Sequence, residues 1–158
     1  MSSEPLRILG VDPGYGRLGY AVLERKNAKE SLITAGCIET PSALAHEKRL
    51  RLIGSSIEKL VREHRPSGLG IEKLFLSTNH KTAMQVAEAR GVALYSAGDL
   101  PVYEFSPPEI KLAVCGYGRA DKRQIAAMIR MIFNPSEPLL DDATDAIAIA
   151  FTALGRIR

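Results

Sequence analysis

The sequence lacks the features that mark several large classes of protein. It has only two cysteines in 158 residues, Cys37 and Cys115, far apart and outside any CxxC pair. No disulfide framework is therefore expected, and a reducing compartment is favoured. No apolar run approaches the roughly 20 residues of a membrane-spanning helix, and the first residues carry no signal-peptide pattern. We therefore expect a soluble, cytoplasmic protein that contacts no membrane.

Several familiar catalytic motifs are absent as well. No GxxxxGK[ST] phosphate loop occurs, no serine stands in GxSxG, and the three histidines are scattered with no HExxH. A P-loop nucleotide site, a serine acyl hydrolase and a histidine zinc site are therefore not expected. The formal net charge of +3 is a mild indication of an anionic partner.

Hydrophobic patterning predicts a single domain of strands and helices over residues 1–158. Strands are expected over 6–12, 16–25, 31–40, 69–72 and 101–105, and helices over 43–64, 79–97, 107–115, 121–133 and 139–150. The short connections among the first three strands favour antiparallel hairpins, and the first two helices suit right-handed crossovers to parallel strands. We expect an α/β fold with a five-stranded mixed sheet and helices on both faces.

Four carboxylates stand at the ends of these elements. Asp12 ends the first strand, Glu72 ends the fourth, and Asp142 and Asp145 share one face of the last, alanine-rich helix. If the first and fourth strands are neighbours, Asp12 and Glu72 meet at one edge of the sheet, where the last helix can meet them. Gathered carboxylates repel one another and resist burial, so the pattern predicts a site for hard divalent cations. Two such ions can promote phosphodiester hydrolysis.

Each acid also has a simpler interpretation. Asp12 precedes Pro13-Gly14 and can be only a turn residue. Asp142 and Asp145 can be acids that the dipole favours near a helix N-terminus. That interpretation suits Asp141 better, because Asp141 lies outside the face that the other two share.

Six segments point to one known family. The segments are 10–14, 19–22, 71–75, 89–93, 107–111 and 142–150. In this order, and over nearly the whole chain, they resemble the RuvC family of bacterial Holliday junction resolvases. The resemblance implies a ribonuclease H-like fold and a homodimer that resolves four-way DNA junctions by paired symmetric nicks, in recombination and repair. It also implies Mg²⁺ or Mn²⁺ as cofactor, and the branch-migration proteins RuvA and RuvB as partners.

The resemblance assigns roles to individual residues. It makes Asp12, Glu72, Asp142 and Asp145 the catalytic metal ligands. Phe75 matches an aromatic residue near the junction centre, and Lys111 and Lys122 match basic residues that contact DNA near the scissile phosphate. Lys73 departs from the family pattern, in which Gln or Glu is more usual, and puts a cation beside the site.

Three further residues are expected at the DNA. Tyr117, Arg119 and Arg123 cluster with Lys122 around a glycine-rich turn, which suits a mobile phosphate-gripping patch. An ordinary solvated basic face is the alternative, and Phe75 in turn can be a core residue. The small-residue helix over 79–97 is also expected to supply a twofold dimer interface.

Other functions stay open at this stage. An actin-like or sugar-kinase domain also begins with Asp-x-Gly after its first strand, although 158 residues leave no room for its second lobe. A junction-binding module without catalysis would lack one of the four acids. A related ribonuclease H-like enzyme that acts on RNA remains an alternative within the nuclease class.

Overall fold

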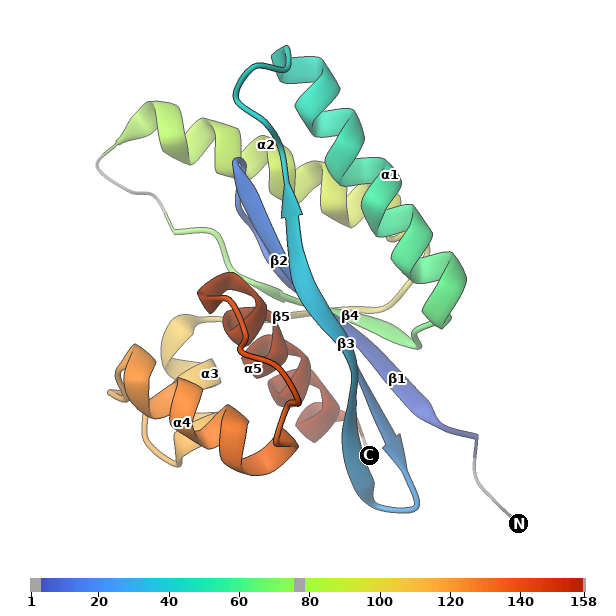
Figure 1. Cartoon of the computed structure of the whole chain (residues 1–158), viewed down its shortest axis with the longest axis vertical. Helices are drawn as coiled ribbons and strands as arrows, with labels where there is room; N and C mark the ends of the chain where they lie inside the picture. The colour runs from blue at the N-terminus through green and yellow to red at the C-terminus, as the bar shows by residue number, and fades with distance from the viewer. Residues whose placement is uncertain (1–3, 76–78, 158) are drawn as a thin grey trace.

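A five-stranded mixed sheet forms the centre of the fold (Figure 1). The computed structural model describes residues 4–75 and 79–157. The strands are β1 (Leu6–Asp12), β2 (Arg17–Lys26), β3 (Lys29–Glu39), β4 (Gly68–Glu72) and β5 (Val102–Phe105). Their spatial order is β3-β2-β1-β4-β5, with β1, β2 and β3 antiparallel and β4 parallel to both β1 and β5. The predicted mixed sheet is confirmed, and β1 and β4 are neighbours.

Helices cover both faces of the sheet, as expected. They are α1 (His46–His64), α2 (His80–Ser96), α3 (Pro107–Cys115), α4 (Lys122–Phe133) and α5 (Asp141–Arg156). Helices α1 and α2 pack on one face, and α3, α4 and α5 on the other (Figure 1). Among the described residues, no helix is both long and apolar enough to span a membrane.

The central strand β1 is apolar on both sides because each face has its own core. Ile8 belongs to the cluster formed with α3, α4 and α5, whereas Leu9 and Val11 belong to the cluster formed with α1 and α2. Successive side chains of a strand point to opposite faces, so an unbroken apolar run is what a doubly covered strand requires.

Helix α5 lies almost directly on β1 and β2. A Cβ atom added to Gly10 would lie 2.3 Å from the carbonyl oxygen of Ala146, and one added to Gly19 would lie 2.0 Å from that of Asp142. Neither glycine can carry a side chain at such a distance, so both permit the close approach of the helix. This contact fixes the start of α5 beside the end of β1.

The observed element bounds differ from the predicted ones in a few places. Helix α5 continues to Arg156 rather than ending near Ala150, because Thr152 and Leu154 extend its buried face along the sheet. Strands β2 and β3 pair as far as Lys26 and Lys29 across a two-residue turn, Asn27-Ala28, in which both residues have positive φ. Alanine is unusual at a position of positive φ, so a turn this tight could not be predicted from the residue types.

Candidate active site

The four predicted acids line one pocket of about 400 Å³. Val11 pairs with Ile71 in the parallel register of β1 and β4, so Asp12 and Glu72 follow at the same edge of the sheet. Asp142 and Asp145 reach the pocket from the first two turns of α5. Asp141 is a first-turn acid that does not line this pocket, as its place outside the shared face predicts.

Burial and mutual repulsion both act on the acids of the pocket. Burial raises the pKa of Asp12 to about 8, with further contributions from the charges of Asp145, Glu72 and Asp142. Burial is also the main cause of the raised pKa values of Glu72 and Asp145, each of which has a further acid nearby. A cation placed among such buried, neighbouring acids would stabilise their ionised forms.

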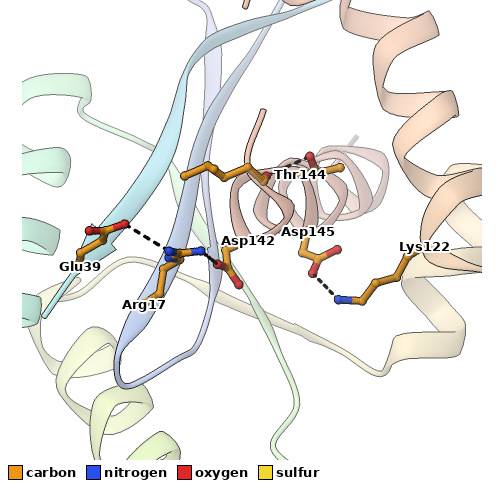
Figure 2. Close-up of polar contacts among 7 residues, drawn as sticks. Arg17, Glu39, Lys122, Asp142, Thr144 and Asp145 are labelled. Carbon is orange, nitrogen blue, oxygen red and sulfur yellow. Dashed lines mark hydrogen bonds and ion pairs between the residues drawn. The ribbon is translucent and has the colours of Figure 1, made fainter. Parts of the chain in front are cut away.

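Two cations of the chain already stand against the acids of α5 (Figure 2). The ammonium of Lys122 lies 3.6 Å from Asp145 Oδ2. On the opposite side, Arg17 Nη1 lies 3.6 Å from Asp142 Oδ2, and Arg17 Nη2 lies 3.4 Å from Glu39 Oε1. Sequence reasoning missed Arg17 and Glu39, because their proximity to Asp142 depends on where α5 crosses the sheet.

The acids share a pocket without forming a ready-made metal cage. Among residues 4–75 and 79–157, no three His, Cys, Asp or Glu side chains converge closely enough to hold a metal ion. The chemistry of the pocket nevertheless fits a hard divalent cation, because the described part of its lining offers four carboxylates and no thiol or imidazole. Burial raises the pKa values of Asp12, Glu72 and Asp145, so a cation placed among them would favour their charged forms.

Neighbouring contacts hold the strand ends that carry Asp12 and Glu72. Arg90 Nε donates to the Glu72 carbonyl oxygen at 3.2 Å, and the same guanidinium binds Glu104 at 2.5 Å. After Asp12, the hydroxyl of buried Tyr15 lies 2.7 Å from Nδ1 of His46, which also pairs with Glu88 of α2. These contacts join residues far apart in the chain, so the sequence offers no signal for them.

The predicted DNA-contacting residues fall into two groups. Lys111 and Lys122 line the pocket, and the capping box of Asp121 with Gln124 fixes the start of α4 just before Lys122. Phe75 is 58% exposed and lines a smaller hollow that Asp12, Glu72 and Lys73 also border. The core interpretation of Phe75 is therefore wrong, and its contact with DNA stays a prediction.

Tyr117, Arg119 and Arg123 are not brought to the pocket. All three are exposed, and none belongs to the pocket lining among the described residues. They lie on the turn after α3 and on the first turn of α4. Their contact with DNA therefore stays a prediction.

Comparisons of the sequence with known proteins all identify one family. The family described as "Crossover junction endodeoxyribonuclease RuvC" matches residues 8–153. A protein of that name from Thermosipho melanesiensis is 46% identical over 149 residues, which cover 92% of this chain and 95% of that protein. One from Halothermothrix orenii is 42% identical over 146 residues, which cover 90% of this chain and 88% of that protein.

Solved structures show the same likeness. T. thermophilus RuvC in complex with Holliday junction substrate aligns with a TM-score of 0.87 at 30% identity, over 93% of this chain and 92% of that one. The yeast mitochondrial Holliday junction resolvase Ydc2 aligns with a TM-score of 0.66 at 14% identity, which concerns the fold alone. The expected ribonuclease H-like fold is thereby confirmed.

Proposed function

The chain belongs to the RuvC family of crossover junction endodeoxyribonucleases, and from this membership we propose that it resolves four-way DNA junctions by paired symmetric nicks. It is thus a structure-selective endodeoxyribonuclease of recombination and repair. One observation supports the assignment of the reaction to a particular site. Four carboxylates from three separate elements line the same pocket as two lysines, Lys111 and Lys122.

The acids would hold the metal cofactor. Asp12, Glu72, Asp142 and Asp145 supply the oxygen ligands that Mg²⁺ prefers, and Mn²⁺ can replace it. Held by these acids, two such ions would supply activation of the attacking water and stabilisation of the leaving oxygen of the phosphodiester. In the metal-free protein Asp12 carries a proton at neutral pH, because its pKa is about 8. That proton has to leave the carboxyl before Asp12 can act as a ligand.

Cationic and aromatic side chains around the pocket would hold the DNA. Lys111 and Lys122 bind phosphates of the strand to be cut, because both lysines line the same pocket as the acids. Such contacts hold the DNA in place and do not depend on base sequence. Exposed Phe75 stacks on a base next to the junction centre. Tyr117, Arg119 and Arg123 extend the basic surface away from the pocket.

We also propose that the chain acts as a homodimer through α2. Met84, Gly91 and Tyr95 are exposed and lie on one face of this helix, with Met84 64% and Tyr95 86% accessible. A Cβ atom at Gly91 would meet nothing within 4 Å, so no contact within the chain requires a glycine there. Glycine inside a helix costs about 0.5–1 kcal/mol relative to alanine. Close approach of α2 from a second copy would explain why a glycine stands at position 91.

The family membership supports the remaining expectations. We propose that residues 1–158 form one nuclease domain that works in the cytoplasm. RuvA and RuvB are the proposed partners, because a resolvase acts on junctions that branch-migration proteins move.

A cleavage assay tests the proposal directly. A synthetic mobile four-way junction and a linear duplex of matched sequence are incubated with the protein, with and without Mg²⁺ or Mn²⁺. We expect paired symmetric nicks on the junction, only with metal and not on the duplex. Tight junction binding without cleavage in either metal would instead indicate a binding module. In a parallel reaction with an RNA strand of the same sequence, cutting equal to that of the junction would favour the ribonuclease alternative.

A further inference from the structure

Arg17 lies between two carboxylates at the edge of the catalytic pocket (Figure 2). One side of its guanidinium is 3.4 Å from Glu39 and the other is 3.6 Å from Asp142. Lys122 pairs with Asp145 on the opposite side, so each acid that α5 contributes to the pocket stands next to one cation.

The direction of Arg17 is set by the sheet rather than by the ion pairs. Alternate residues of β2 face α5, and Gly19 and Ala21 both pack against that helix. Arg17 lies two residues before Gly19 on β2, so its side chain leaves the strand on the same face of the sheet, toward α5. Glu39 is its cross-strand partner on β3. The side chain of Arg17 therefore leaves β2 on the side of the sheet where α5 begins.

The two ion pairs of Arg17 are easy to exchange. Both distances exceed those of direct hydrogen bonds, and the side chains of Arg17 and Glu39 are 50% and 64% exposed. Exposed pairs of this kind contribute little to stability. A phosphate group can replace a carboxylate as the partner of a guanidinium, because both offer oxygens that match its planar fork.

We propose that Arg17 couples metal loading to DNA binding. In the free protein its positive charge beside Asp142 opposes the entry of a divalent cation. When DNA binds, the guanidinium exchanges Asp142 for a backbone phosphate, and the carboxylate becomes available as a ligand. The inference rests on the proposed function, because it takes Asp142 as a metal ligand. Because such coupling is reciprocal, metal also strengthens the binding of DNA.

Metal binding in the absence of DNA provides the first test. Isothermal titration of Mn²⁺ into the DNA-free protein compares the wild type with Arg17→Ala, Arg17→Lys and Arg51→Ala. Arg51 is an exposed arginine of α1 and serves as the charge-matched control. We expect Arg17→Ala to bind Mn²⁺ about fivefold more tightly. Arg17→Lys should stay close to the wild type because it keeps the charge, and Arg51→Ala should not differ from it.

Junction binding without metal provides the second test. Anisotropy of a labelled four-way junction in EDTA is measured over a range of salt concentrations. Loss of one phosphate contact in Arg17→Ala should reduce the slope of log K against log[salt] by about 1. Arg17→Lys should restore the wild-type slope. A melting temperature equal to that of the wild type shows that each variant is folded.

The outcomes separate this inference from the proposed function. Equal Mn²⁺ affinities for wild type and Arg17→Ala, or equal salt slopes, would overturn the role of Arg17 while leaving the metal site intact. Mn²⁺ binding that persists unchanged in both Asp12→Asn and Asp145→Asn would instead overturn the four-acid site itself. Tighter Mn²⁺ binding together with a shallower salt slope supports the coupling.

Discussion

The two parts of helix α5 have opposite character. Its first two turns carry Asp142 and Asp145, whose side chains remain 32% and 29% exposed and face cations. From Ala146 to Leu154 every residue except Phe151 is buried, and this part packs on β1, β2 and β4. One helix therefore joins a charged, partly exposed site to a buried part of the core.

The difference shows how such a site can exist at all. Burial of carboxylates disfavours the folded state, and repulsion between neighbouring acids adds to this cost. Both effects raise the pKa values of Asp12 and Asp145. The apolar part of α5 supplies the packing that offsets this cost and holds the acids in position. Changes to the pocket acids of the first part should therefore remove activity without unfolding the protein, whereas changes in the second part should lower the free energy of unfolding.

The largest expected effect is the loss of cleavage in Asp145→Asn. A neutral amide cannot replace a charged ligand, so junction cleavage should fall below detection while junction binding persists. Folding stability should not fall, because one of the repelling charges is removed. Gel assays of cleavage and binding, with a melting curve, measure all three quantities.

Asp141→Asn is the matched control for that experiment. Asp141 lies in the same first turn but outside the pocket lining, so cleavage should remain close to that of the wild type. Its stability should fall by at most about 1 kcal/mol through loss of a favourable helix-dipole interaction. Wild-type turnover in Asp145→Asn would contradict the four-acid site.

Gly10→Ala tests the packed part of α5. The added Cβ would lie 2.3 Å from the Ala146 carbonyl oxygen and 2.7 Å from the Ala150 Cβ, so helix or strand has to move. We expect a loss of about 3 kcal/mol in the free energy of unfolding, measured by urea denaturation. Gly155→Ala, where a Cβ meets nothing within 4 Å, should be neutral or slightly stabilising. Equal stability of Gly10→Ala and wild type would mean that α5 does not lie so close to β1.

The sequence alone predicted the framework of the site but not its electrostatic partners. Asp12 and Glu72 could be found because each ends an apolar run, and the shared helix face of Asp142 and Asp145 follows from spacing. Arg17 and Glu39 could not be found, since their position depends on the glycine contacts that bring α5 onto β2. The pair of His46 with Glu88 likewise depends on the packing of α1 against α2.

Asp12→Asn tests the cost of the charged site through the pH dependence of folding stability. The carboxyl has a pKa of about 8 in the folded protein against an ordinary value of 3.8, so between these values the folded state retains a proton that the unfolded state loses. Wild-type stability should therefore fall as pH rises through this range, by up to about 1.4 kcal/mol per pH unit. Asparagine cannot ionise, so the variant should gain relative to the wild type as pH rises from about 4 to about 8.

Urea denaturation of metal-free protein at several pH values measures this difference. Saturating Mg²⁺ should stabilise the wild type and leave Asp12→Asn unchanged. A difference between Asp12→Asn and wild type that does not vary with pH would show that Asp12 is already ionised in the folded protein.

Phe75→Ala should give the smallest effect and tests a residue that belongs to neither part of α5. Its ring is 58% exposed beside Lys73 and the acids, so the change should alter melting temperature little. Loss of one aromatic–base stack should weaken the protein's interaction with the junction by about 1–3 kcal/mol, measured as the drop in cleavage efficiency. Tyr95→Ala, which removes an even more exposed aromatic ring on α2, is expected to weaken dimerisation rather than this contact. A large fall in melting temperature for Phe75→Ala would mean that the ring supports the fold, and the stacking role would then be lost.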